Sequence, residues 1–358
     1  MEGNNSRPLW RIRVDGVDIT ASLDARLISL THTDNRGMEA DQLDLTLDDA
    51  DGRLALPPRG AVLSLALGWE GDGIVDKGTF TVDEVEHSGA PDQVTIRARS
   101  ADLRAGLSTQ RTRSFHQVNV ASIVNDIAAA HGLTAAIAAT LASELIDHLD
   151  QTNESDANLL TRLSGMFDAI ATIKAGRLVF MPAGAGISAS GKPLPVMSIT
   201  RADGDQHRFS LAERDSYTAV KALYNDIDLG QQGAVIWSKA EGDAEKRKTV
   251  NSQPAVAQAI EPSADNMKTL RHTYSSQANA KRAARTEWRR IQRGMAQFSL
   301  TLARGRQDLF PDLRAAVSGW KPEIDGTEWC LTRVTHNLSD SGYTTALEME
   351  VKATELPG

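Results

Sequence analysis

Residues with the types and spacing needed for chemistry are few in this sequence. Gly186 to Lys192 fit the first seven positions of the phosphate-binding pattern G-x-x-x-x-G-K, but Pro193 stands where a magnesium-binding serine or threonine belongs. A bound phosphate would also need a helix N-terminus facing it, and the prolines at 193 and 195 argue against a helix that starts there. This stretch therefore fits a flexible loop better than a nucleotide site.

Other catalytic patterns are missing from the sequence. No two histidines have H-x-x-x-H spacing, no G-x-S-x-G elbow occurs, and Cys330 is the single cysteine. Glu154 and Asp156 form a carboxylate pair, but they stand at an expected helix start, where free N–H groups account for acidic residues. A glycosidase pair is defined by its separation in space, so the sequence leaves that alternative open without favouring it. We expect no catalytic, cofactor-binding or metal-binding residues.

A basic stripe lies on an expected helix at residues 276–296. An apolar stripe at helical spacing predicts this helix: Ala280, Ala284, Trp288, Ile291 and Met295. Basic side chains form a second stripe beside it: Lys281, Arg282, Arg285, Arg289, Arg290 and Arg293. Such a stripe is usually a solvated face, and the alternative is docking against an acidic surface such as the N-terminal β region of a neighbouring subunit. Nucleic-acid binding is less favoured, since no aromatic residues interleave with the arginines.

The charge is unevenly distributed along the chain. Residues 1–110 hold 11 Lys/Arg and 19 Asp/Glu, a balance of −8 that equals the net charge of all 358 residues. A solvated acidic face is the simpler interpretation, and a docking surface or a wall that repels a polyanion is the sharper one. The negative net charge argues against general nucleic-acid binding. The sequence has no apolar run of eighteen residues and no secretory signal, so we expect a soluble, cytoplasmically made protein without a membrane segment.

Hydrophobic alternation predicts β-strands through the first hundred residues. Leu43, Leu45 and Leu47 alternate with polar residues, which is typical of a half-buried strand. Further strands are expected at 9–14, 17–20, 62–69, 78–87 and 93–100. Short strands at this close spacing indicate a small barrel or sandwich.

Helical spacing begins near residue 110. Asn119 and Ser155 are expected to start helices, another helix is expected at 138–149, and a hairpin at 169–180. After a Gly- and Pro-rich loop at 182–195, strands return, with a polar excursion at 238–272 and the helix at 276–296 between them: 208–211, 217–227, 297–302, 315–318, 329–338 and 344–351. The predicted class is α+β, mainly β. A first small β-barrel spans 1–108, an α+β insert 109–182, and a second small barrel 183–358, with one long amphipathic helix before its C-terminal strands.

Several segments resemble a known family. Gln151 to Asp156, followed by Leu159–Leu163, is similar to the Q-x-x-E-S-D…L-x-R-L signature of phage late-control D tail proteins and of the related type VI secretion spike proteins. Other similar segments extend the resemblance to roughly residues 10–355: 171–178, 190–195, 319–326, 334–338 and 341–345. One departure is Asp168, which stands where the family usually has a glycine before an alanine.

The resemblance implies a structural baseplate hub protein of a contractile phage tail or tailocin. Proteins of this kind carry two small β-barrels per chain and assemble as homotrimers, so that six barrels form a ring between the six-fold tail tube and the three-fold central spike. The implied role is mechanical, and the implied partners are the spike, the tail tube and other baseplate proteins. No cofactor, stable nucleic-acid binding or membrane segment is implied. The implied location is the virion tail baseplate, after assembly in the cytoplasm of the bacterial host.

Two other classes of protein compete with the hub. A tail-associated cell-wall hydrolase would need a catalytic domain, and we expect no segment to be left for one after the barrels, the insert and the long helix are assigned. An effector-delivery spike would need a long C-terminal β-helix or needle. Because the last expected strand is followed closely by Gly358, we expect the spike to be a separate protein.

Overall fold

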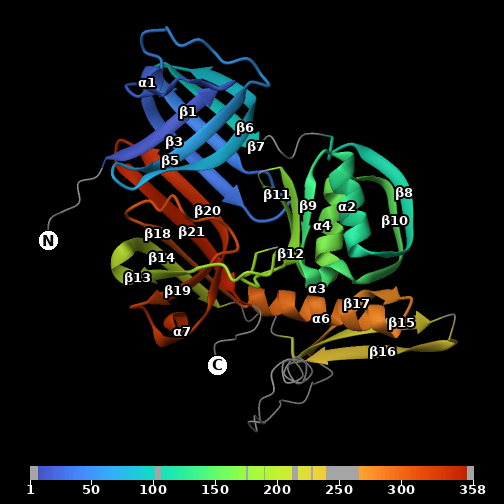
Figure 1. The fold of residues 1–358 in the computed structure, drawn as a ribbon. Helices are drawn as coiled ribbons and strands as arrows, with labels where there is room; N and C mark the ends of the chain where they lie inside the picture. The colour runs from blue at the N-terminus through green and yellow to red at the C-terminus, as the bar shows by residue number, and fades with distance from the viewer. Residues whose placement is uncertain are drawn as a thin grey trace.

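The chain consists of two β modules, an α+β insert and a small sheet covered by a long helix (Figure 1). A computed structural model describes residues 7–100, 106–174, 176–188, 190–211, 217–226, 229–238 and 266–352. The predicted class, α+β and mainly β, is confirmed. Among the described residues, no helix combines the length and the apolar character needed to cross a bilayer.

The first β module forms from the alternating strands of the N-terminal region. Leu43, Leu45 and Leu47 all point into one core with the inward residues of the neighbouring strands, as the alternation predicted. The module consists of β1 (Pro8–Val14), β2 (Val17–Asp18), α1 (Thr20–Leu23), β3 (Leu27–Asn35), β4 (Gln42–Asp48), β5 (Val62–Trp69), β6 (Gly73–Ser88) and β7 (Gln93–Ser100). Its six main strands lie in the order β3-β4-β7-β6-β5-β1.

The second β module repeats this connectivity with different residues. It consists of β13 (Val196–Thr200), η2 (Arg201–Asp203), β14 (Gly204–Leu211), β18 (Ala296–Leu302), β19 (Arg314–Ser318), α7 (Pro322–Asp325), β20 (Trp329–Ser339) and β21 (Gly342–Val351). Its strands lie in the order β14-β18-β21-β20-β19-β13. When the six main strands of each module are numbered along the chain, both sheets have the order 2-3-6-5-4-1. The two modules therefore share one topology, although the last pair is antiparallel in the first and parallel in the second.

Closure of either module into a separate barrel is not confirmed. Strand β20 pairs with β3 of the first module, so both modules belong to one thirteen-stranded sheet. Its main path runs from β14 to β1 and β2, and β19 and β13 branch from β20. The pairing is antiparallel and covers seven residues of each strand, Arg333–Ser339 and Ser29–Asn35. The free edge of β20 thus binds the other module instead of closing its own (Figure 1).

The α+β insert lies beside the two modules and has its own core (Figure 1). Asn119 and Ser155 cap α2 and α4 by accepting hydrogen bonds from Ser122 N and Asn158 N, and both predicted helix starts are thereby confirmed. The elements are β8 (Gln110–Asn119), α2 (Val120–Ala130), β9 (Thr134–Ile137), α3 (Ala139–Ala142), β10 (Leu145–Ser155), α4 (Asp156–Phe167), β11 (Ala169–Lys174) and β12 (Arg177–Pro182).

The helix expected at 138–149 is wrong beyond its first turn. Only Ala139–Ala142 is helical, and Leu145 begins β10, which pairs antiparallel with β8. The alanine-rich stretch has high helix propensity, but pairing with β8 buries Ile146 and Leu149 in the insert core. Tertiary pairing therefore outweighs local propensity here.

The strand expected at 217–227 forms, but it does not join the second module. It is β15 (Ala219–Asp226), which lies in a separate three-stranded sheet with β16 (Gln231–Ser238) and β17 (Met267–Tyr274). Helix α6 (Gln277–Gly294) covers one face of this sheet, and the predicted apolar stripe packs there with Ala280, Ala284, Trp288 and Ile291 buried. Most of the polar excursion expected at 238–272 lies outside the described residues, and its last part forms β17.

Candidate functional site

The joint between the two β modules is the first candidate site. His32 on β3 and His336 on β20 are opposite each other in the ladder, both are buried, and their rings stack at 5.6 Å with an interplanar angle of 10°. Burial lowers the pKa of both histidines well below the usual value, so both are neutral near pH 7. His336 Nδ1 lies 3.0 Å from the Tyr343 hydroxyl and 3.1 Å from Thr345 Oγ1. The two stacked rings are therefore buried and uncharged where the modules meet.

Side-chain contacts outside the ladder also fix the two modules to each other. Trp69 Nε1 donates a hydrogen bond of 2.7 Å to the carbonyl oxygen of Gly305, and the guanidinium of Arg304 lies 4.6 Å from the Trp69 ring centroid. Lys77 Nζ donates to the carbonyl oxygen of Leu309 at 3.2 Å. Burial lowers the pKa of Lys77 to about 8. These contacts connect the two modules at several places outside the ladder.

A buried charge network joins the modules to each other. Arg36 Nε lies 2.8 Å from Asp312 Oδ1, its Nη1 binds Glu350, and its Nη2 lies 3.0 Å from Cys330 Sγ. Burial opposes the charge of Arg36, but Asp312 and Glu350 hold its pKa above the ordinary value. Burial raises the pKa of Asp312 and raises that of Cys330 to about 11, so the thiol is protonated and inert. Arg36 belongs to the first module and its three partners to the second.

The same network reaches the long helix and the insert. Arg293 at the end of α6 is buried, lies 3.5 Å from Glu350, and donates from Nη1 to Asp168 Oδ2 at 2.9 Å. Asp168 ends α4 with a φ of 53°, in the left-handed region that favours glycine. Asp168, which stands where the family usually has glycine, thus supplies a carboxylate that connects the insert to α6.

The signature that carries the family resemblance builds a corner of the insert. Gln151 is fully buried, and its Nε2 donates to the carbonyl oxygen of Glu154 at 2.8 Å and to Asp156 Oδ1 at 2.9 Å. Arg113 Nη2 lies 2.7 Å and His131 Nε2 2.8 Å from the buried Asp156 carboxylate. Burial opposes ionisation, but the hydrogen bonds of Gln151 and His131 lower the pKa of Asp156. These residues hold β10 against α4 and are structural.

Two residues of the basic stripe are committed to contacts inside the chain. Arg293 belongs to the buried network just described. Arg282 places its guanidinium 4.6 Å from the ring centroid of Phe167, and its Nη1 donates to the carbonyl oxygen of Leu145 at 3.1 Å. Both arginines therefore fasten α6 to the insert.

The other four residues of the stripe are more accessible. Lys281 is exposed, with Nζ 5.7 Å from a tryptophan ring of the adjoining sheet, and Arg290 is exposed and lies 2.7 Å from Glu287. Arg285 and Arg289 are half-buried and also interact within the chain. Docking of the stripe against another protein stays a prediction, and it concerns mainly these four residues.

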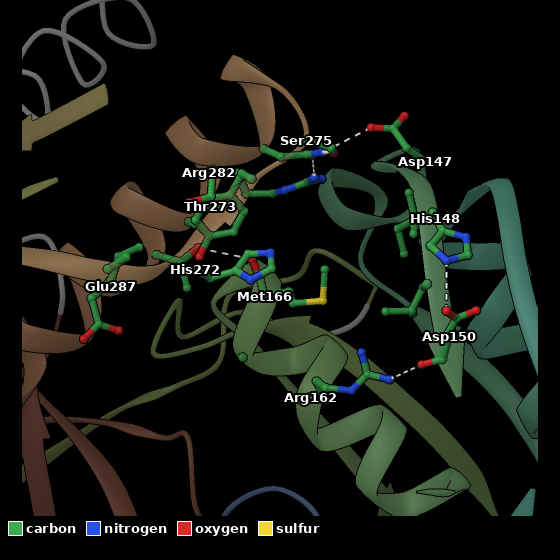
Figure 2. A pocket seen from close by; sticks show the side chains of 18 of the residues that line it. Asp147, His148, Asp150, Arg162, Met166, His272, Thr273, Ser275, Arg282 and Glu287 are labelled. Atoms are coloured by element: carbon green, nitrogen blue, oxygen red, sulfur yellow. Dashed lines mark hydrogen bonds and ion pairs between the residues drawn. The ribbon is translucent and has the colours of Figure 1, made fainter. Parts of the chain in front are cut away.

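A pocket of about 890 Å³ separates the insert from the helix-covered sheet (Figure 2). Strand β10 and helix α4 line one side, and β17 and α6 line the other. His148 Nε2 lies 2.9 Å from Asp150 Oδ2, and Arg162 Nη2 donates to the carbonyl oxygen of Asp150 at 2.6 Å. Ser114 donates to Asp150, not to His148, whose other neighbour is His116 at 3.0 Å. A hydrolase triad needs a histidine that contacts the serine hydroxyl, and His148 makes no such contact with Ser114.

The remaining chemical candidates have structural explanations. The loop at 186–192 folds back on itself, with Ser188 N donating to the carbonyl oxygen of Lys192 at 2.8 Å, and strand β13 follows it instead of a helix. The geometry needed to bind a phosphate at a helix start is thus absent from the described part of this loop. Within the described residues, no three His, Cys, Asp or Glu side chains are grouped as metal ligands.

Sequence reasoning missed the joint and the charge network. His32 and His336 are 304 positions apart in sequence, and Arg36 is 276 to 314 positions from its partners, so no local pattern brings them together. The only local signal was the alternation that placed each histidine on the inward face of a strand. Burial there requires a neutral or paired side chain.

The fold defines a protein made of two like β modules with an α+β insert between them. A family model described as phage tail baseplate hub (GPD) matches residues 37–342. The chain is 45% identical over 371 residues to the probable baseplate hub protein of Escherichia phage 186, with 99% of this chain and 95% of that protein covered.

Solved structures with low sequence identity share the fold. The tail protein from Neisseria meningitidis MC58 has a TM-score of 0.66 at 14% identity, with 97% of this chain and 98% of that chain covered. The E. coli c3393 protein, a component of the type VI secretion system, has a TM-score of 0.52 at 13% identity, with 97% and 76% covered.

The chain belongs to the phage tail baseplate hub family. The resemblance to late-control D tail proteins is therefore confirmed. The chain is a structural component of the virion tail and is not an enzyme, as its relatives indicate. The comparisons give the hydrolase alternative no support.

Proposed function

We propose that three copies of this hub protein form a ring that connects the six-fold tail tube to the three-fold central spike. The observation that carries the proposal is the shared strand order of the two β modules within one chain. A ring of three such chains presents six modules of like topology to a six-fold partner and keeps a three-fold arrangement of inserts for the spike. The role is mechanical, and assembly takes place in the bacterial host cytoplasm.

The parts of the chain take separate roles in this proposal. The two β modules, which lie within residues 1–108 and 183–358, supply the ring, and residues 109–182 form a lateral unit. The β3·β20 ladder and the Arg36 network hold the two modules at a constant angle, which a rigid ring subunit requires. The accessible part of the basic stripe, with Lys281 and Arg290, is proposed as a contact to an acidic surface of a neighbouring tail component.

The solution mass of the hub with its spike protein tests this function. We expect a complex that contains three hub chains for each spike trimer, because only that ratio presents six modules around a three-fold axis. Sedimentation of the purified chain alone, of the spike alone and of their mixture gives the ratio directly. The same measurement on the Lys281→Glu, Arg290→Glu variant tests the basic stripe, which predicts weaker assembly. A complex with one or two hub chains per spike trimer would contradict the ring.

A further inference from the structure

One strand in each module changes its partner at a β-bulge. Strand β20 pairs with β19 at Trp329 and Cys330, passes a bulge between Leu331 and Arg333, and then pairs with β3 of the other module. Along its whole length β20 also pairs with β21. The second half of β20 is thus the element that joins one module to the next.

Strand β6 occupies the same position in the first module and has the same bulge. It pairs with β5 as far as Thr81, and its pairing with β7 is interrupted between Val82 and Glu84. From Glu84 to Ser88 it pairs with β7 only, and no strand among the described residues lies along its other edge. In the first module, therefore, the half of β6 that corresponds to the joining half of β20 has no partner on its outer edge within the described residues.

Strand β14 has the complementary open edge. It occupies in the second module the position that β3 occupies in the first, and it pairs only with β18 within the described residues. Most of β14 is exposed, including Leu211 at 58%. Unpaired sheet edges are liabilities that proteins cover or use.

We propose that residues 84–88 of β6 in one copy pair antiparallel with β14 of the next copy, repeating the β20·β3 ladder between chains. This inference rests on the proposed ring function and specifies its interface. Each copy offers one β6 edge and one β14 edge, so the contact is head-to-tail, and three such contacts would close the proposed ring.

The internal ladder also fixes the register of the contact. The bulges align Arg333 with Glu84, so that Val334 corresponds to Val85 and His336 to His87. On the other strand, Phe209 corresponds to His32. Phe209 pairs with Phe298, and His32 pairs with Leu43. These two partners lie opposite Met349 and Ala98, which occupy equivalent places in the two sheets. The resulting pairs are Val85–Leu211, Glu86–Ser210, His87–Phe209 and Ser88–Arg208.

The side chains in this register are complementary. On one face, the half-buried Val85 meets the exposed Leu211, and His87 meets Phe209 where the internal ladder has two stacked rings. On the other face, Glu86 and Arg208 are diagonal neighbours of opposite charge. A one-residue slip would place Leu211 on the polar face, so the apolar pattern itself opposes other registers.

Cysteine pairs test the proposal in the full-length chain bound to its spike protein. The variant Glu86→Cys, Ser210→Cys places thiols at directly opposed positions, with Cα atoms about 4.5–5.5 Å apart, within the range that a disulfide bridges. The native Cys330 is buried and does not interfere. We expect mild oxidation to produce covalent dimers and trimers on a non-reducing gel. A mixture of the two single variants should produce only dimers, because each bond joins two copies.

The matched control is Glu84→Cys, Arg208→Cys on the same two strands and the same face. In the proposed register these positions are four residues apart along the strands, about 13 Å, too far for a disulfide. If the three-chain complex forms but the first pair fails to cross-link, or the control links equally well, the strand pairing is wrong while the ring function stands. If sedimentation shows no multichain complex at all, the ring function itself fails.

Discussion

Replacement of Arg36 by leucine is expected to lower the free energy of unfolding by about 3–5 kcal/mol, the usual loss when one partner of a buried ion pair is removed. The reason is that Asp312 is left buried without its cation, 2.8 Å from the vacated guanidinium position. Glu350 also loses Arg36 but keeps Arg293 at 3.5 Å. Urea denaturation followed by tryptophan fluorescence measures the loss.

Two further variants separate this effect from the loss of any arginine. Arg7→Leu removes an exposed ion pair with Asp24 at 3.0 Å and should cost no more than about 1 kcal/mol. Addition of Asp312→Leu to Arg36→Leu should restore part of the stability, because the unpaired carboxylate is removed with it. If the double variant were less stable than Arg36→Leu alone, the network would not work as described.

Acidification is expected to loosen the joint between the modules through His32 and His336. Their pKa values in the folded chain lie well below that of an unfolded histidine, near 6.5, so the unfolded state binds more protons below that pH. Stability is therefore lost as the pH falls. Between pH 6.5 and pH 5 the two histidines together should lower the free energy of unfolding by about 3 kcal/mol.

Neighbouring ionisable groups also change how steeply the free energy of unfolding falls with pH, and their pKa values give the direction. Burial raises the pKa of Asp34, on the same strand as His32, to about 6, so its protonation in the folded state favours folding as the pH falls and offsets about 1 kcal/mol of the loss. Lys77 has a pKa of about 8 and is protonated in both states throughout this window. The His32→Leu, His336→Leu variant removes the histidine contribution and keeps the others. Urea titrations at several pH values from 7 to 5 should show that the free energy of unfolding falls more steeply for the natural chain than for this variant. Parallel declines of the two chains would refute the role of the histidine pair.

The local elements of the fold were predictable because each depends on nearby residues. The alternation of Leu43, Leu45 and Leu47 predicted a strand, and Asn119, Ser155 and the stripe through Trp288 predicted three helices. The strand at 145–155 and the separate sheet of β15 to β17 were not predictable in this way. Both depend on pairing with distant segments, which the sequence pattern does not record.

The repeated topology was hidden for a physical reason. A β module needs inward apolar residues and compatible turns, and very different residues satisfy both conditions. The equivalent positions Phe209 and His32, for example, share only their place on the inward face of a strand. The insert and the helix-covered sheet also separate corresponding strands by unequal lengths of chain, so no fixed sequence period remains.

An image of the hub bound to its spike, reconstructed by electron cryomicroscopy without imposed symmetry, tests the central claim most directly. We expect a closed ring of six β modules in which first and second modules alternate, with three inserts at the same level and unbroken sheet between adjacent chains. A ring with modules of one kind side by side, or a single hub chain seated on the spike, would contradict it.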